Sequence, residues 1–477
     1  MLIFVHFRVI NQLRSSEDRW SIGIRLFFDT RGPQVRHFGL SLVRDYLHAA
    51  NRSGGGSEDA LQHTRETIFM FVRNSIEQSV GQNVWPFEVY IVNYLVSIIT
   101  LCIKIDCPER WPTAFSDLLV LGSGEGNING AGFVVGVLTE MDVEIVEFNN
   151  ERSQREILHN TVIKDYIRDG NIAQELSIFL CSTAINSRQA GLIELSKQAL
   201  NAFAQMIGWI DVNLVIKCAL PSIYQCMNDA YIGGAACSCI FELVKKGMDP
   251  LQKVQLVNDI ELIQIILSVN IKDNEDGDDT EDGNNVAEEL GPIVDILVQE
   301  LLGVWISCED QMHKTAASLA STMLAANGCI MQAATTCLTE ISLTSADMLR
   351  VLMPQLLRIF GHSDVDVSST VTDSVNKIIA LLKSQNQKLD SLRTVKDIIP
   401  RIFIAEEFLN DLLLNIYKQM QFPSDFAFDP DDEDDAVIIE VSVFVRFVLM
   451  YDVIVSICAL CDWLYDITLR ASIERPP

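Results

Sequence analysis

Glycine and proline are scarce in this chain: 477 residues contain 25 glycines and 13 prolines. Folds made of many short strands need frequent tight turns, which use both residues, so the composition argues against an all-β fold. The chain is also longer than the size at which one hydrophobic core keeps growing. We therefore expect several domains or one elongated array of repeats.

Motifs of the common enzyme classes are missing as well. There is no Gly-x-x-x-x-Gly-Lys-Ser/Thr phosphate loop, and no Gly-x-Gly-x-x-Gly joins a strand to a helix. Neither Gly-x-Ser-x-Gly nor His-Glu-x-x-His occurs, and the seven histidines are scattered. We expect no catalytic residue, no cofactor and no enzymatic activity.

Cysteine spacing gives no sign of a disulfide framework or a metal site. The 12 cysteines are scattered, which is typical of reduced, buried thiols in the cytosol or nucleus. Cys458 and Cys461 form a Cys-x-x-Cys, but no second pair of ligands accompanies them. We predict no metal.

Membrane signals are weak at both ends. The first ten residues are apolar, but His6 and Arg8 interrupt them and no small-residue cleavage site follows. The segment 441–469 is more apolar, yet Asp452 would lie near the bilayer centre, where a charge is costly. We expect no membrane insertion.

The net charge is −28 and it is unevenly distributed. Residues 1–120 contain 12 basic and 12 acidic residues, and the rest of the chain contains 24 and 52. Such a surface would repel a phosphate backbone over most of its area. The charge alone therefore favours basic protein partners over nucleic acid.

Apolar residues recur at helical spacing almost throughout, and alternation with period two is rare. The segment 235–246 reads as one helix, and Gly247, a residue that tolerates a positive φ, should end it. Asp249 suits an N-cap and Pro250 the first position of a second helix. That second helix should bury one face, formed by Leu256, Ile260, Ile263 and Leu267.

Asp211 is a cap of the same kind, 38 residues before Asp249. This spacing is close to the period of about 40 residues of HEAT repeats. Each helical hairpin exposes an apolar stripe that only a neighbouring hairpin can cover. The sequence therefore predicts an all-α fold, an α-solenoid of HEAT-like two-helix repeats, with a solvated acidic loop at 272–285.

Several stretches resemble exportin-T, the tRNA exportin of the importin-β/karyopherin family. They occur in the family's order: PERWPTAFSDLL at 108–119, HNTVIKDYIRD at 159–169, GWIDVNLV at 208–215 and CIFELVKKGMDPLQKVQLV at 239–257. The resemblance implies the N-terminal half of such a carrier. Residues 7–120 would be importin-β-like repeats that bind Ran, and 121–440 exportin-type HEAT repeats.

Residues 441–477 depart from the family pattern, because its charged helix is replaced by an apolar tail. We expect this tail, like the apolar first residues, to reflect a truncated or mis-spliced gene model.

The resemblance also implies partners. Such carriers bind tRNA together with GTP-bound Ran. They contact nuclear pore proteins as they shuttle between nucleus and cytoplasm. We also expect the chain to be a monomer. Ran would meet the second helix of the first repeat, here about residues 34–48. Its polar face supplies the candidates Arg36, Arg44 and Asp45, although for any single residue an ordinary solvated helix face is the commoner explanation.

Candidates for tRNA contact are Lys164 and Arg168, one turn apart on a helix over 160–169, and Lys245 with Lys246 at a helix end. Lysines at a helix C-terminus also simply compensate the helix dipole. Two other functions remain open. One is a karyopherin for protein cargo, and the other is a HEAT scaffold without a role in transport.

Overall fold

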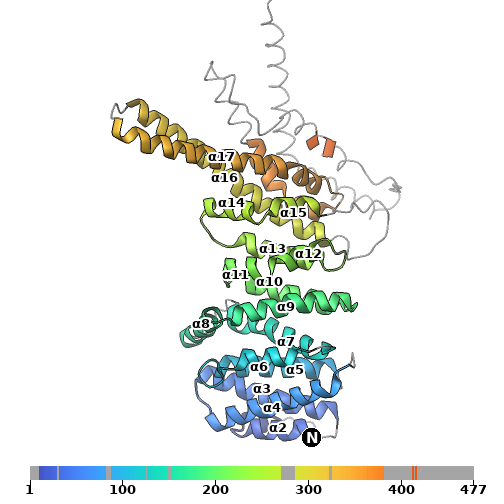
Figure 1. The fold of residues 1–477 in the computed structure, drawn as a ribbon. Coiled ribbons are helices and arrows are strands. Elements are labelled where there is room, and N and C mark those ends of the chain that lie inside the picture. Colours follow the sequence, from blue (N-terminus) through green and yellow to red (C-terminus); the bar gives the residue numbers. More distant parts are fainter. Residues whose placement is uncertain are drawn as a thin grey trace, which may run out of the picture. The chain divides into compact units, whose positions relative to one another are not determined.

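The computed structural model describes residues 10–29, 32–81, 87–124, 126–147, 152–269, 285–321, 325–362, 364–380, 411–412 and 414–415. Within these ranges the secondary structure is helical and contains no strand (Figure 1). The chain divides into two compact units, unit 1 (Met1–Cys226) and unit 2 (Met227–Pro477). Each is described by itself.

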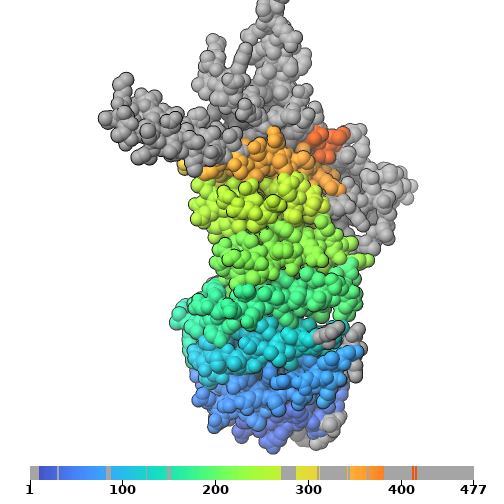
Figure 2. All heavy atoms as spheres, viewed as in Figure 1, coloured from blue at the N-terminus to red at the C-terminus, as the bar shows by residue number. Residues whose placement is uncertain are grey.

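Unit 1 is built from consecutive pairs of helices. The pairs are α2 (Arg19–Phe28) with α3 (Pro33–Ser53), α4 (Glu58–Ser79) with α5 (Val89–Asp106), α6 (Ala114–Gly122) with α7 (Ile128–Met141), and α9 (Ile172–Gln189) with α10 (Ile193–Ile207). A π-helical turn, η1 (Asp142–Val146), continues α7, and α8 (Gln154–Asp169) lies between the third and fourth pairs in the sequence. In Figure 2 the atoms of unit 1 follow one another in bands from blue to green.

The pairs of unit 1 form two layers. The second helices of the pairs form one layer, in which α3 contacts α5, α5 contacts α7 and α7 contacts α10. The first helices form the other layer, in which α2 contacts α4, α6 contacts α9, and α9 contacts α11 (Val212–Cys218). HEAT-like repeats have this pattern: the helical pairs stack on one another, the first helices form one layer and the second helices form the other. The predicted fold class is therefore confirmed.

Helix α5 shows why a helix inside the layer of second helices must be apolar on more than one face. It contacts α3 on one side and α7 on the other. Two described helices, Val89–Asp106 and Val286–Cys308, are long and apolar enough to cross a membrane by length and composition alone. In both, more than half of the residues (61% and 56%) are buried inside the protein. Apolar residues all round a helix are what a position between two other helices demands.

Two glycines bring α2 and α3 together. A Cβ at Gly23 would lie 2.6 Å from the carbonyl oxygen of Gly39, and a Cβ at Gly39 would lie 2.6 Å from that of Gly23. The backbones of the two helices thus touch where neither residue has a side chain. The first predicted repeat is confirmed, with a second helix that ends five residues beyond the predicted residue 48.

The predicted aspartate caps are both confirmed. Asp211 Oδ1 accepts hydrogen bonds from the backbone N–H groups of Asn213 and Leu214, at 2.8 and 3.3 Å. Asp249 begins α14 (Pro250–Asp259) in the same way, with Pro250 at the first helical position. In sequence order each cap is followed by two short helices and then a longer one. These are α11, α12 (Leu220–Met227) and α13 (Gly233–Lys245), then α14, α15 (Leu262–Ser268) and α16 (Asn285–Ser321).

Helix α13 ends at Lys245, close to the predicted end at Gly247, and the chain leaves it at Lys246 with extended backbone angles (φ −54°, ψ 134°), without a positive φ at Gly247. The prediction for the next helix is wrong. The single helix predicted over 250–267 is broken: Glu261 has a φ of 52°, and α15 begins after it.

Unit 2 contains a long pair of helices, α16 and α17 (Ala325–Phe360), which lie side by side (Figure 1). Helix α16 also packs on α13 and α14, α17 packs on α15, and both contact α18 (Val365–Ser369). The predicted acidic loop at 272–285 lies outside the described residues except for Asn285, and the tail at 441–477 lies outside them entirely.

Candidate interaction surface

Helix α8 belongs to none of the stacked pairs, and its start is fixed by its own sequence. Ser153 is the N-cap, and its hydroxyl accepts from the N–H of Glu156. The Glu156 carboxylate accepts in return from the N–H of Ser153 at 3.0 Å, which completes a capping box. The helix predicted to begin at residue 160 therefore begins at 154, and Asn160 is a buried residue in its middle.

Little apolar surface holds α8 in place. Its buried residues are Asn160, Ile163 and Ile167, whereas Leu158 is 68% exposed and Val162 44% exposed. Helix α8 packs on α9, and hydrogen bonds join it to several other elements of unit 1.

The first half of α8 reaches the end of α3. Asn51 Nδ2 donates to Glu156 Oε1 at 2.8 Å, and the Arg155 guanidinium reaches the carbonyl oxygens of Ser53 and Gly54, both at 3.5 Å. Gly54 has a φ of +61°, and a Cβ there would lie 1.0 Å from Arg155 Nη1. The glycine that ends α3 therefore also makes room for the arginine.

The middle of α8 meets the ends of α5 and α7. His159 Nε2 lies 2.7 Å from the carbonyl oxygen of Lys104, and since a carbonyl only accepts, Nε2 carries the proton. Asn160 Nδ2 donates to the carbonyl of Ile145 in η1 at 3.0 Å. Beside them the Lys104 ammonium, which is almost fully buried, pairs with Glu144 at 2.8 Å and ties α5 to η1.

A polar surface results where α3 and α8 meet. We call it the α3–α8 surface and define it as Arg44, His48, Asn51, Arg52, Arg155 and Glu156. Burial lowers the pKa of His48 below its ordinary value, and Arg44, Arg52 and Lys104 lower it further while Glu144 opposes them. Its three arginines outnumber the single carboxylate of Glu156, which gives this surface a net positive charge in an acidic protein.

The Ran candidates lie on α3, and two of them also take part in packing. The Arg44 guanidinium lies 4.4 Å from the ring centroid of Tyr94 on α5, and that of Arg36 lies 5.7 Å from the ring centroid of Phe87. Asp45 is half-exposed, 3.9 Å from Arg14. Their assignment to Ran stays a prediction.

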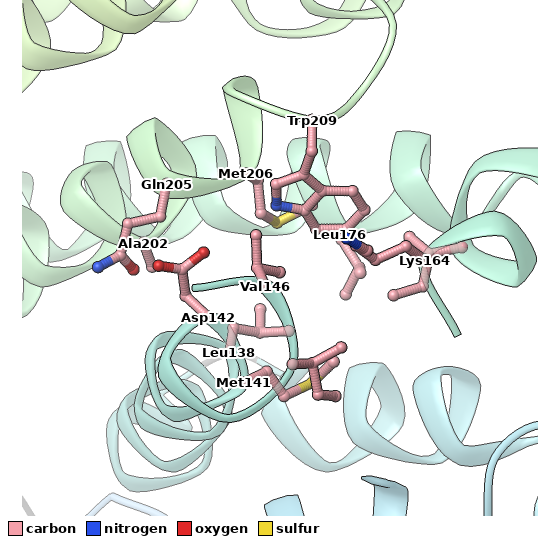
Figure 3. A pocket seen from close by; sticks show the side chains of 12 residues that line it. Leu138, Met141, Asp142, Val146, Lys164, Leu176, Ala202, Gln205, Met206 and Trp209 are labelled. Atoms are coloured by element: carbon pink, nitrogen blue, oxygen red, sulfur yellow. The ribbon is translucent and has the colours of Figure 1, made fainter. Parts of the chain in front are cut away.

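Lys164 and Arg168 both approach Trp209. Figure 3 shows Lys164 beside its indole ring, and the Arg168 guanidinium lies 5.7 Å from the ring centroid. Lys164 is half-buried at the edge of a small apolar hollow that Met141, Met206 and Trp209 help to line. Trp209 Nε1 is buried there without a hydrogen-bond partner. Arg168 is already engaged, because its Nε donates to the carbonyl of Trp209 at 2.8 Å and it pairs with Asp165 at 3.0 Å.

The other two tRNA candidates belong to unit 2. Lys245 pairs with Glu242 at 3.3 Å and lies 5.1 Å from the ring centroid of Phe241. Lys246 is half-buried at the end of α13. Both fit the helix-end interpretation at least as well as an RNA contact.

The family-like stretch at 108–119, which contains Trp111, Pro112 and Phe115, contributes to packing. Phe115 is 1% exposed, and Trp111 donates from Nε1 to Asp117 at 2.7 Å. The carbonyl of Pro112 accepts from the Tyr166 hydroxyl of α8 at 2.6 Å. This segment therefore anchors α8 as well as α6.

Metal and thiol chemistry find no support in the part of the chain that the structure describes. No group of three or more His, Cys, Asp or Glu side chains there could hold a metal ion. Burial raises the pKa of the thiols of Cys107, Cys181 and Cys237 to about 12, so that they stay protonated near neutral pH.

Sequence reasoning missed Asn51, Arg155 and His159, which build the contacts of α8. The sequence does contain a sign of where α8 begins, because Ser153 and Glu156 have the spacing of a capping box. Reading that motif would have placed the helix start before Arg155. The partner of Arg155, about a hundred residues away, could not have been found from local pattern.

Comparison with known proteins adds relatives. A family model described as exportin 1-like protein matches residues 88–240, a range that includes α8. Exportin-T of Danio rerio is 23% identical over 435 residues, which cover 90% of this chain and 39% of that protein. Exportin-T of Mus musculus is 22% identical over 80% of this chain and 34% of its own length. Exportin-T of Dictyostelium discoideum is 27% identical over 46% of this chain and 20% of its own length. The chain thus spans at most about two fifths of these relatives, and the predicted resemblance is confirmed.

Proposed function

Because the chain is a relative of the exportin-T proteins over most of its length, we propose that it is the N-terminal part of a nuclear export receptor. In this proposal it carries tRNA from nucleus to cytoplasm together with GTP-bound Ran, and contacts nuclear pore proteins on the way. The observation that supports it most is the similarity to an exportin-T over 90% of the chain.

Stacked repeats suit such a role physically. A folded tRNA is recognised through its A-form shape, its phosphates and its 2′-hydroxyls, which requires a long surface more than a pocket. Each repeat adds a small rotation, so a chain of them can adapt its pitch to a bulky cargo. If Ran favours the pitch that tRNA needs, tRNA must strengthen Ran binding by the same factor.

Charge limits where RNA could bind. Unit 1 has 19 basic and 24 acidic residues, whereas unit 2 has 17 and 40. Phosphates are repelled far less by unit 1, which includes the α3–α8 surface and Lys164. We therefore assign tRNA and Ran contacts to unit 1, with Arg36, Arg44 and Asp45 toward Ran and Lys164 and Arg168 toward tRNA. Lys245 and Lys246 are the weaker candidates.

The acidity of unit 2 favours a second candidate function, a karyopherin for protein cargo. Basic protein segments would be attracted by the surface that repels RNA. The two candidates share Ran but differ in cargo.

A binding experiment separates these functions. The full chain is incubated with labelled tRNA, with and without GTP-locked Ran, and affinity is followed by fluorescence anisotropy. We expect tRNA to bind more tightly with GTP-locked Ran and no more tightly with GDP-bound Ran. Equal tRNA affinity in all conditions would count against the tRNA carrier. Ran-dependent binding of a basic peptide instead would favour protein cargo, and a chain that ignores Ran would be a scaffold.

A matched pair of variants localises the RNA contact. Lys164→Gln should lower the slope of log affinity against log salt by about 1, the loss of one phosphate contact. Lys217→Gln is the control, because Lys217 is exposed in the same unit and makes no hydrogen bond or ion pair among the described residues. Equal slopes for both variants would remove Lys164 from the tRNA site.

A further inference from the structure

The hydrogen bonds of α8 have a common kind of acceptor. Apart from those to Glu156 and Pro112, its hydrogen bonds with other elements end on backbone carbonyls where the second helices of the four pairs finish. The acceptors are Ser53 and Gly54 after α3, Lys104 in the last turn of α5, Ile145 in η1 after α7, and Trp209 just after α10.

Such carbonyls are the natural partners for these donors. The last four carbonyls of a helix have no partner within it, and they form the negative end of the helix dipole. Two of the α8 donors, Arg155 and Arg168, are cationic, and His159 donates a ring N–H. One helix thus supplies end caps to four others.

The dimensions of α8 match this task. Its 16 residues make a rod of about 24 Å. Packed helices lie about 8–10 Å apart, so four neighbours in one layer span three spacings of that size. Arg155 near one end contacts α3, and Arg168 near the other contacts the turn after α10.

We propose that α8 is a splint, which fixes the rotation between the four helix pairs from α2/α3 to α9/α10. In an ordinary solenoid each repeat contacts only its neighbours, and small rotations between repeats are free to add up. Here any such rotation moves a carbonyl away from a donor on the same rigid helix. The four pairs therefore move as one body, and changes of pitch occur in the repeats beyond α10.

The test compares two substituted full-length chains. Arg155→Ala with Arg168→Ala removes both ends of the splint. Lys217→Ala is the control, since it removes an exposed cation that makes no hydrogen bond or ion pair among the described residues. Fluorescent amino acids at Arg25 on α2 and Asn201 on α10, both exposed, report the distribution of distances across the four pairs.

We expect the Arg155/Arg168 variant to broaden this distance distribution and to exchange the amides in the last turns of α3 and α10 roughly fivefold faster. The control should match the unsubstituted chain, and the amides of unit 2 should not change. Faster exchange of α8 alone, with an unchanged distance distribution, would overturn the proposal, and so would equal effects in the control. Should the double variant not fold, Arg155→Ala alone gives the same test at the α3 end.

Discussion

Asp106 closes α5 with a carboxylate that is 2% exposed and lies between two arginines. Arg65 Nη1 on α4 is 2.6 Å from one of its oxygens, and Arg110 Nε is 2.7 Å from the other. Arg65 in turn lies 5.5 Å from the ring centroid of Trp111. One residue thereby joins α4, α5 and the segment before α6.

Replacing Asp106 with Asn should lower the free energy of unfolding of unit 1 by about 2–4 kcal/mol, because two guanidinium groups lose their buried counter-charge. Urea unfolding followed by circular dichroism measures the change. Glu77→Gln is the matched control: its pair with Arg73 is exposed (57% and 61%) and should contribute about 0.5 kcal/mol or less. Similar losses in both variants would mean that burial does not strengthen the Asp106 contacts.

His48 makes stability depend on pH near neutrality. Its pKa is lowered in the folded chain, chiefly by burial, from 6.5. Between the folded and unfolded values the unfolded chain binds more protons, so the free energy of unfolding falls as pH falls below about 6.5. His48→Gln should remove part of this fall, measured as urea midpoints from pH 7 to pH 5. An unchanged fall of the midpoint in the His48→Gln chain would contradict this expectation.

Individual residues were predictable where a local motif decides their role. Asp211, Asp249 and Pro250 were placed correctly, because an N-cap acts on the two or three residues that follow it. Gly247 was placed correctly at a helix end, but its tolerance of a positive φ is not used, because the chain leaves the helix through extended angles at Lys246. The partners of Arg168 or Lys164 depend on which turn packs beside α8, and local pattern does not contain that information.

At the scale of elements, the contact of α2 with α3 depends on Gly23 and Gly39. Gly39→Ala should destabilise the chain by about 1–3 kcal/mol, because the added methyl group meets backbone atoms that cannot turn aside. Gly132→Ala in α7 is the control, since its nearest atom would be 3.7 Å away. There the lower entropy of the unfolded chain should give a neutral or stabilising change. Thermal unfolding of both variants measures the difference, and a neutral Gly39→Ala would refute the close approach.

Helices as such were predictable from apolar spacing, and their interruptions were not. The break at Glu261 lies inside a run of apolar residues whose periodicity continues through it. The break is needed because the two helices bury different sides of the chain. Val254 and Val257 are buried in α14, and Leu262 and Ile266 in α15. Only packing against other helices determines such a change.

For the whole molecule, charge separates the two units: unit 1 carries a net −5 and unit 2 a net −23. Raising the ionic strength from about 10 mM to about 100 mM shortens the screening length from about 30 Å to about 10 Å and weakens self-repulsion. Hydrogen exchange should therefore slow in α13 to α16 more than in α2 to α10. Equal slowing in both units would show that net charge does not limit the stability of unit 2.

The fold of the described part of the chain was predictable to the level of stacked helical pairs. Periodicity, the 38-residue spacing of caps and the order of the family-like stretches all indicate it. The position of α8 was not, because Asn51 and Glu156 meet across 105 residues of chain. Local regularity reveals the repeating units, whereas a helix that serves several of them at once has no repeat of its own.

The fixed length of α8 has an evolutionary consequence. Repeat proteins commonly gain or lose units by duplication, and stacked arrays tolerate this because each junction resembles the next. A pair inserted between α3 and α10 would move their end carbonyls about 10 Å further apart, beyond the reach of a 16-residue rod. The number of pairs beneath α8 is therefore constrained to four, whereas the array beyond it is free to lengthen or shorten.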